Sequence, residues 1–314
     1  MSEVTPVIYL LAGVTAAGKS DLSLKWAEQM RGEVLSCDSI AIYRGMDIGS
    51  AKPSADERKR VCHHGIDIVD ADTIFSVVDY LLYAKGVVGK AVEKSTPVLV
   101  TGGSGFYLQS FLSPVVDEIN VGMEVRQQVE KLNEERGLDG LLQELKEHNP
   151  DGLGDLDVLN PRRVMRALER CLASGKTILE LKKEFERQEA PYANFEKRLI
   201  WLDRENEEIE ARIAERTKQM LDDGLLEETE KLLSLGIERN PSASNSVGYR
   251  ECIACLKGEI PENELSSLIN QSTRRLVSKQ RKWFRKHFGN EARILISDAL
   301  ELSEPSEWNW IRHS

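Results

Sequence analysis

The chain has 314 residues, 41% hydrophobic and 30% charged, which is enough for one large globular domain or two smaller ones. Its longest apolar runs are only as long as a strand, so a membrane span is not expected. An acidic residue, Glu3, precedes the first of these runs, so a signal peptide is not expected either. We therefore expect a cytoplasmic location. A net charge of −10 argues against indiscriminate binding to polyanions, although a local basic surface can still bind nucleic acid.

The first third of the chain alternates short apolar runs with helical patterns. Residues Val7–Gly13 are expected to form a buried strand, and the apolar spacing across Lys19–Met30 predicts a helix. Further strands are expected at Gly32–Asp38 and Pro97–Gly103, with a helix at Ser76–Val92 between them. This alternation predicts an α/β fold with a parallel sheet, whose sites lie at the carboxyl ends of the strands.

The middle of the chain has mainly helical patterns. Asn160 is expected to cap a helix that begins at Pro161, because the two residue types favour these positions. A strand at Arg198–Asp203 is expected to return the chain to the sheet, and a last strand is expected at Arg293–Ile296. We therefore expect a core domain at 1–113 and 199–314 that includes C-terminal helices, and an inserted all-helical domain at 114–198.

A phosphate-binding pattern, G-x-x-x-x-G-K-[ST], lies between the first expected strand and helix. In such a loop the backbone N–H groups point inward and the lysine adds a full positive charge, while the serine, Ser20, is a candidate Mg²⁺ ligand. With the parallel sheet, this predicts a P-loop NTPase-like core that binds a diphosphate, without distinguishing a nucleotide from another diphosphate ester. The candidate diphosphate ligands in the loop are Gly13, Val14, Thr15, Ala16, Ala17, Gly18, Lys19 and Ser20.

Two further polar positions follow expected strands. Asp38 comes at the end of the second strand, where a carboxylate can hold a metal ion or accept a proton from a nucleophile. The alternative is an aspartate that only caps a turn. Ser104 follows the third strand, so three chemistry-bearing segments are expected at one edge of the sheet.

Positive charge is concentrated in two helical segments. Between Arg274 and Lys286 there are seven Lys or Arg residues and no acid, and an arginine-rich side is expected on the helix that begins at Pro161. A charge run of this kind is either a solvated helix face or a contact for RNA phosphates, and the pattern leaves both open. Tyr43 and Tyr249 can likewise either stack on a base or pack in a core.

Ordered motifs along nearly the whole chain resemble those of the bacterial tRNA dimethylallyltransferase (tRNA isopentenyltransferase) family. The motifs are GVTAAGKS, DSIAIYRGMDIGSAKP, HHGIDI, GGSGFYL, NPRRVMRALE, RIAERTKQMLDDGLLEE, SVGYRE and TRRLVSKQRKWFR. The resemblance implies transfer of a dimethylallyl group from dimethylallyl diphosphate to the N6 amine of the adenine immediately 3′ of the tRNA anticodon, position 37, with Mg²⁺. We expect the chain to act as a monomer on the anticodon stem-loop, with the target adenine extruded from its stack.

The resemblance also implies roles for particular residues. Asp38 is the general base for the N6 proton and Ser104 lies beside the reacting groups, while Lys19 and Arg216, with Arg212 as a further candidate, contact the diphosphate. Ala41 stands where many family members have glutamine, which leaves open how the adenine and its neighbours are read. The residues in segments that resemble tRNA contacts are Asp38, Ser39, Ile40, Ala41, Ser104, Arg126, Arg162, Arg163, Val164, Met165, Arg166, Asn245, Ser246, Val247, Gly248, Tyr249, Arg250, Thr273, Arg274, Arg275, Lys279 and Gln280.

Three alternative functions remain open at this point. A small-molecule P-loop kinase explains the phosphate loop but not the basic helices. An adenylate isopentenyltransferase would use the same chemistry on a free nucleotide, and would not need the tRNA-contact segments. A non-enzymatic, nucleotide-dependent RNA-binding switch predicts RNA binding that survives Asp38→Ala with no covalent change in the RNA.

The cysteines and histidines give no metal-site spacing. Five scattered cysteines fit a reducing compartment, and the one CxxC pair, Cys252 and Cys255, is expected on a helix. His63 and His64 are adjacent and have no third ligand nearby in the sequence, so they are expected to be structural.

Overall fold

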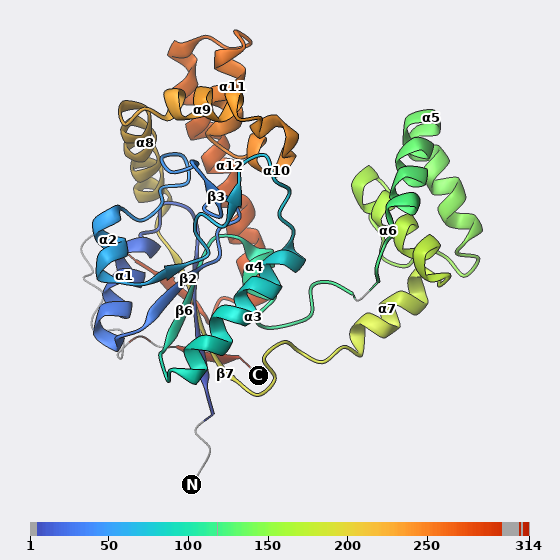
Figure 1. Ribbon diagram of the computed structural model, residues 1–314, viewed down its shortest axis with the longest axis horizontal. Helices are drawn as coiled ribbons and strands as arrows, with labels where there is room; N and C mark the ends of the chain where they lie inside the picture. The colour runs from blue at the N-terminus through green and yellow to red at the C-terminus, as the bar shows by residue number, and fades with distance from the viewer. Residues whose placement is uncertain (1–4, 118, 297–307, 309, 314) are drawn as a thin grey trace. The chain divides into compact units, whose positions relative to one another are not determined.

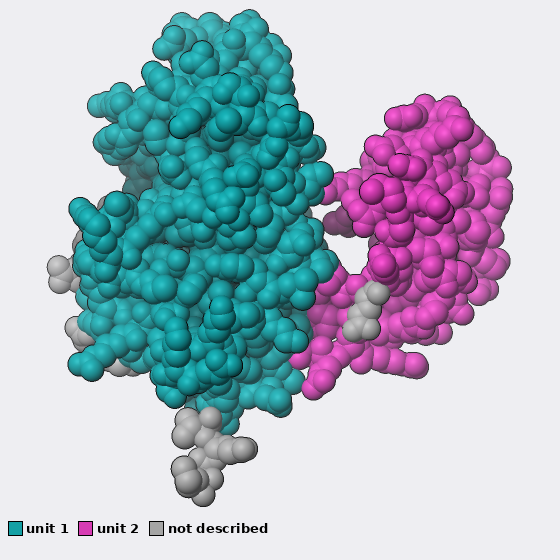
Figure 2. Space-filling view, in the orientation of Figure 1, with its two compact units in different colours: residues 1–113, 191–314 teal, residues 114–190 magenta. Residues whose placement is uncertain are grey.

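The computed structural model describes residues 5–117, 119–296, 308 and 310–313. It divides into two compact units, one made of residues 1–113 and 191–314 and the other of residues 114–190 (Figure 2). The second unit ends at Ala190, earlier than the expected boundary at 198. The reason is that Tyr192 and Phe195 pack against the core of the first unit, directly before strand β7.

The first unit is built on a mainly parallel sheet (Figure 1). Its parallel strands lie in the order β4 (His63–His64), β2 (Glu33–Ser36), β6 (Val98–Gly102), β1 (Val7–Gly13), β7 (Glu196–Asp203) and β8 (Arg293–Leu295). Strand β9 (Ile311–His313) pairs with β7 antiparallel, and β3 (Tyr43–Arg44) pairs with β5 (Val69–Asp70) in a separate ribbon. The expected α/β fold with a parallel sheet flanked by helices is confirmed.

The helices of the first unit cover the sheet and extend past it. They are α1 (Lys19–Met30), α2 (Ala55–Arg60), α3 (Val77–Glu93), α4 (Gly105–Gln109), α8 (Asn206–Asp222), α9 (Leu225–Ser234), α10 (Pro241–Ser244), α11 (Tyr249–Leu256) and α12 (Glu262–Phe288), with a 3₁₀ turn at Ile237–Arg239. Helix α1 has the bounds that the sequence predicts. Helix α3 starts one residue after Ser76, whose hydroxyl accepts the Asp79 N–H while the Asp79 carboxylate accepts the Ser76 N–H.

Two hydrophobic cores stabilise the first unit. One surrounds the sheet and buries side chains such as Leu10, Trp26 and Trp201. The other packs the segment around Ile42 and Tyr43 against α9, α11 and α12. Helices α9, α10 and α11 lie beyond the carboxyl ends of the strands, and α12 runs from them along the sheet (Figure 1). Segments that belong to both cores of the first unit therefore surround the edge of the sheet where strands β1, β2 and β6 end.

The second unit is helical, with α5 (Met123–Glu147), α6 (Pro161–Ser174) and α7 (Ile178–Glu186). Helix α5 is interrupted at Gly137, which has φ 58° and ψ −159°. The Asn160 side chain accepts the Arg163 N–H and Pro161 is the first helical residue of α6, so the predicted helix start is confirmed. In the described part of the chain, no helix combines the length and hydrophobicity needed to cross a membrane.

Candidate active site

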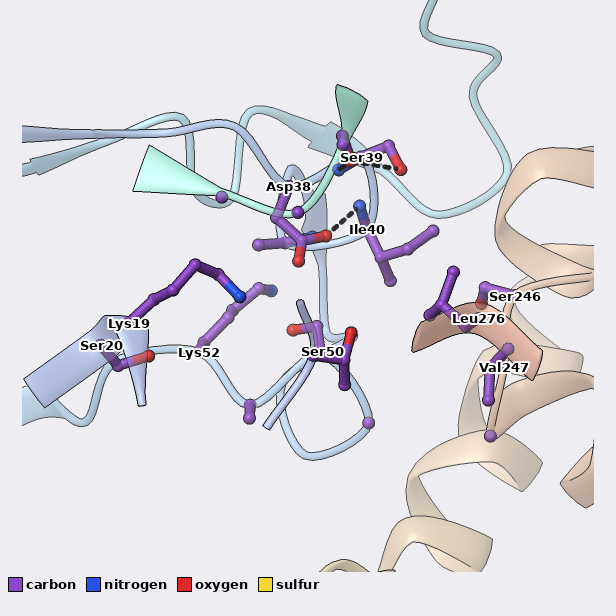
Figure 3. Close-up of a pocket in the computed structure, with 18 of the residues that line it drawn as sticks. Lys19, Ser20, Asp38, Ser39, Ile40, Ser50, Lys52, Ser246, Val247 and Leu276 are labelled. Carbon is purple, nitrogen blue, oxygen red and sulfur yellow. Dashed lines mark hydrogen bonds between the residues drawn. The ribbon is translucent and has the colours of Figure 1, made fainter. Parts of the chain in front are cut away.

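A cavity of about 670 Å³ opens at the carboxyl ends of β1, β2 and β6 in the first unit (Figure 3). Lys19, Ser20, Asp38 and Ser104 line it, as do residues from α8, α11 and α12. In a parallel sheet this edge collects the loops that follow each strand, which is why residues far apart in the sequence meet here. The structure thus brings together the three segments that the sequence places after its strands.

The loop between β1 and α1 has the curled backbone of a phosphate-binding loop. Gly18 has a φ of 93°, a conformation that glycine adopts without strain. Lys19 Nζ donates a 2.8 Å hydrogen bond to the Val14 carbonyl, across the mouth of the loop. On the outside, Arg212 Nε donates to the Ala16 carbonyl at 2.8 Å and Arg204 Nε to the Ala17 carbonyl at 3.1 Å. Arg212 therefore braces the loop, and it is not among the residues that line the cavity.

Not every N–H group of the loop is available to a diphosphate. The Val14 N–H donates to the Leu202 carbonyl at 3.2 Å, and the Thr15 N–H donates to Oε1 of Gln280 at 2.8 Å. Nε2 of Gln280 donates to the Gly103 carbonyl at 3.1 Å. Gln280, expected to contact tRNA, therefore joins two loops of the site within the protein.

Asp38 is held in a defined orientation by its own turn. Its Oδ1 accepts the N–H of Ile40 at 2.8 Å and that of Ala41 at 3.3 Å. Asp38 therefore does cap a turn, which was the alternative to a chemical role. The turn occupies only one carboxylate oxygen, Oδ1. Figure 3 shows the carboxylate of Asp38 and the amine of Lys19 directed toward one another in the cavity. A fixed carboxylate with Oδ2 left for another partner is suited to accept a proton.

Ser104 is positioned by Ser39, the residue that follows Asp38. The Ser39 N–H donates to Ser104 Oγ at 3.0 Å, and Ser104 Oγ donates to Ser39 Oγ at 3.2 Å. The close approach of the two loops depends on Gly102, since a Cβ there would lie 2.2 Å from the Cys37 carbonyl oxygen. Asp38 and Ser104 are therefore held in one rigid arrangement.

The floor of the cavity is strongly cationic. Burial and the charge of Arg216 lower the pKa of Lys19 to about 8, while Asp38 opposes this shift. Burial also lowers the pKa of Arg216, and Arg212 lowers it further, with Asp38 again opposing. Buried like charges destabilise one another unless an anion joins them, so this group is arranged to bind a polyanion such as a diphosphate.

Most of the expected tRNA contacts in the first unit lie on the cavity wall. They are Asp38, Ser39, Ile40, Ala41, Ser104, Asn245, Ser246, Val247, Gly248, Arg250, Thr273, Arg275, Lys279 and Gln280. Tyr249 is a correction, because its side chain is fully buried and its hydroxyl donates to Glu228 at 2.6 Å. Tyr43 is also fully buried. Neither tyrosine can stack on a base in this structure, and Arg274 is not part of the cavity lining.

The remaining expected contacts lie in the second unit. Arg162 and Arg163 are exposed on α6, and Arg166 donates to Glu169 at 2.6 Å. Val164 is a correction, because its side chain is fully buried in the core of that unit. A valine at this point of an amphipathic helix packs inward while its arginine neighbours point to solvent.

Three residues that shape the site were not identified from the sequence. Glu228 on α9 accepts the N–H groups of Asp47, Ile48 and Gly49, and thereby holds the loop that continues from Asp38. The side chain of Lys52, in the same loop, is 2% exposed and bridges Asp47 of that loop and Asp67, which follows β4. Arg204 directly follows β7. The sequence could have indicated this residue, because other site residues also directly follow strands.

The histidine pair departs from expectation in one respect. Nε2 of His64 lies 2.7 Å from Glu33 Oε2 and 3.4 Å from Cys62 Sγ. The sequence suggested no third ligand near the histidines, and this is wrong for His64, because pairing of β2 with β4 brings Glu33 beside it. Cys252 is buried on α11 and Cys255 is half-buried, and all five cysteines, each within the described residues, are free.

Comparison with known proteins gives a consistent result. Residues 41–287 match the model of the family described as IPP transferase. A tRNA dimethylallyltransferase from Opitutus terrae is 45% identical over 289 residues, covering 92% of this chain and 93% of the relative. One from Clostridioides difficile is 36% identical, covering 89% of each chain.

Solved structures agree with the sequence comparison. The tRNA delta(2)-isopentenylpyrophosphate transferase of Staphylococcus epidermidis has a TM-score of 0.63 and 29% identity, covering 93% of this chain and 92% of the other. The tRNA isopentenylpyrophosphate transferase of Bacillus halodurans has a TM-score of 0.66 and 28% identity, covering 93% and 90%. A eukaryotic dimethylallyltransferase is similar in fold, with a TM-score of 0.78 at 22% identity, covering 93% and 73%.

Proposed function

The chain belongs to the IPP transferase family, the tRNA dimethylallyltransferases, and from this premise we propose how its cavity residues carry out the reaction. The reaction moves a dimethylallyl group from dimethylallyl diphosphate to N6 of adenine 37 in tRNA. The observation that carries the proposal is that Lys19, Asp38 and Ser104 line one cavity. Membership in this family sets aside the kinase, free-nucleotide and binding-switch alternatives.

In the proposed mechanism the adenine amine attacks the first carbon of the dimethylallyl group. The bond from that carbon to the diphosphate oxygen breaks, its electron pair leaves with the diphosphate, and the N6 proton passes to Asp38. Lys19 and Arg216 stabilise the departing negative charge, and they are already buried and positioned before the substrate binds. Oδ1 of Asp38 is used by the backbone, so Oδ2 is the oxygen that we assign to the N6 proton.

The donor atoms around Lys19 fit a magnesium ion. Mg²⁺ prefers oxygen ligands and usually keeps several waters beside one or two protein groups and the substrate phosphates. Ser20 supplies a hydroxyl on the cavity wall, with the Asp38 carboxylate in the same cavity. A bound Mg²⁺ would neutralise charge on the leaving diphosphate, with Ser20 as its protein ligand.

The cavity wall opposite the loop is proposed to receive the RNA. Arg250, Arg275 and Lys279 provide positive charge there for phosphates of the anticodon loop. Ala41 is 5% exposed and lines the cavity with a methyl group, so we assign it a packing contact with the extruded base rather than a hydrogen bond. We further propose that α6 contacts tRNA through Arg162 and Arg163, and that the chain works as a monomer in the cytoplasm.

Mass spectrometry of a modified RNA tests this function. A matched anticodon stem-loop is incubated with dimethylallyl diphosphate, Mg²⁺ and either wild-type protein or Asp38→Asn, which keeps an oxygen acceptor for the turn. The wild type should add one prenyl mass increment to adenine 37, and Asp38→Asn should lower the rate by about 10²–10⁴. A stem-loop with guanine at position 37 is the control and should gain no mass. An unmodified adenine with the wild type, or full activity in Asp38→Asn, would contradict the proposal.

A further inference from the structure

A second cluster of ligand-type side chains lies outside the reaction cavity. Glu33, Cys62 and His64 each offer one donor atom, and these three atoms lie within 4.8 Å of one another. They supply an oxygen, a sulfur and a nitrogen. The family reaction uses none of the three, so their juxtaposition is not explained by the chemistry described above.

The strand pairing explains why these side chains meet. Strands β2 and β4 are parallel neighbours in which Leu35 is opposite His64. Residues that are opposite one another in neighbouring strands point to the same face, so Leu35 and His64 share a face. Successive residues of a strand alternate between faces, so Glu33 also lies on this face, two residues before Leu35. Cys62 lies on it as well, two residues before His64. His63 points the other way and lines the reaction cavity. Val34 and His63 line the reaction cavity, so the cluster lies on the opposite face of the β2–β4 pair.

The distances in the cluster are close to those of a tetrahedral zinc site. With the usual Zn–N, Zn–O and Zn–S bond lengths, the ligand atoms of such a site lie about 3.4–3.6 Å apart. Nε2 of His64 and Sγ of Cys62 are 3.4 Å apart, which is within this range. Nε2 of His64 and Oε2 of Glu33 are 2.7 Å apart, so Glu33 has to withdraw by roughly 0.7 Å. A glutamate side chain accommodates this by a small rotation.

We propose that Glu33, Cys62 and His64 form a zinc-binding site with water as the fourth ligand. Zinc accepts mixed nitrogen, sulfur and oxygen ligands, whereas Mg²⁺ selects oxygen, so this site and Ser20 select different ions. On binding, Cys62 loses its thiol proton and His64 binds through neutral Nε2, with the protons released to solvent. The ion would cross-link the two-residue edge strand β4 to β2, the strand that precedes Asp38.

Cobalt substitution tests the site in the full-length protein. Co²⁺ bound to a thiolate gives a ligand-to-metal absorption band that oxygen and nitrogen ligands do not give. Metal-free wild-type protein should bind one Co²⁺ with this band, and one equivalent of Zn²⁺ should displace it. Cys62→Ser should abolish the band, and His64→Gln should weaken Zn²⁺ binding at least tenfold. The matched controls are Cys255→Ser, at a half-buried cysteine on α11, and His63→Gln, the adjacent ring on the opposite face.

The outcomes separate clearly. A band that survives in Cys62→Ser overturns the assignment, as does wild-type protein that gives no thiolate band with Co²⁺. Equal loss of Zn²⁺ affinity in His63→Gln and His64→Gln also overturns it, because the geometry assigns the ligand to one ring. Circular dichroism of each metal-free variant checks that the fold is retained, and Cys62 is exposed, so its replacement by serine leaves the core unchanged.

Discussion

The backbone N–H of Thr15 donates a 2.8 Å hydrogen bond to the side chain of Gln280, a residue 265 positions later in the chain. The same side chain donates to the Gly103 carbonyl. One amide thus connects the loop after β1 to the loop that carries Ser104. Gln280 therefore helps to fix the spacing between these two loops of the cavity.

Gln280→Glu should separate this positioning role from simple charge effects. The glutamate keeps the acceptor for Thr15 but places an oxygen against the Gly103 carbonyl oxygen. We expect kcat/KM for dimethylallyl diphosphate to fall about ten- to a hundredfold, which corresponds to roughly 1.4–2.7 kcal/mol. Steady-state kinetics measure this. Gln271→Glu, on the exposed side of α12, adds the same charge and should remain within about twofold of wild type.

The lowered pKa of Lys19, about 8, predicts proton uptake on diphosphate binding. Near pH 8 about half of the free protein has an uncharged Lys19, and a bound diphosphate favours the charged form. Binding should therefore take up roughly half a proton at pH 8, and affinity should fall as the pH rises further. Titration calorimetry in two buffers of different ionisation enthalpy measures the uptake. Binding that is independent of buffer at pH 8 would refute this interpretation of Lys19.

The hydrogen bond from Tyr249 to Glu228 should contribute to stability. Tyr249→Phe keeps the buried ring and removes only the hydroxyl that donates at 2.6 Å to a carboxylate. The free energy of unfolding should fall by about 1–2 kcal/mol, measured by urea denaturation. Glu228→Gln should lower it too, and also raise KM, because an amide cannot accept all three N–H groups of the 47–49 loop. Glu227→Gln, on the exposed side of α9, is the control and should have little effect on either quantity.

The exposed arginines of α6 test the role of the second unit. The double variant Arg162→Ala and Arg163→Ala should weaken tRNA binding, and the slope of log affinity against log salt should become shallower by about one for each lost phosphate contact. Filter binding over a range of salt concentrations measures both. Lys182→Ala, at an exposed ion pair on α7 of the same unit, is the control. An unchanged slope in the double variant would mean that this face of α6 is simply solvated.

Local signals predicted much of the fold. Strand β1 and helix α1 have the expected bounds because glycine and lysine of the loop separate two strong patterns, and α6 begins where Asn160 and Pro161 indicate. The residues that follow strands could be assigned to one edge from the alternation alone. These features depend on interactions between residues that are near neighbours in the sequence, or follow from the presence of a parallel sheet. Hydrophobic periodicity and turn-forming residues therefore predict them.

Long-range partners could not be predicted in the same way. Nothing in the sequence around Glu228 indicates that it accepts N–H groups from residues about 180 positions earlier. The motifs place Val164 and Tyr249 among polar neighbours, although packing against distant helices buries both. Glu33 and His64 meet only because β4 adds to the edge of the sheet beside β2. Such contacts depend on tertiary packing, which local patterns do not encode.

The central position of β1 also has a consequence for synthesis of the protein. It lies between β6 and β7, so this strand pairs with residues 98–102 and 196–202, which are made much later. On the ribosome β1 therefore emerges well before its second neighbour exists, and one of its two backbone edges stays unpaired until residues 196–202 have been made. A chaperone that shields this strand until residue 203 has emerged should raise the yield of folded protein more than one that acts after release.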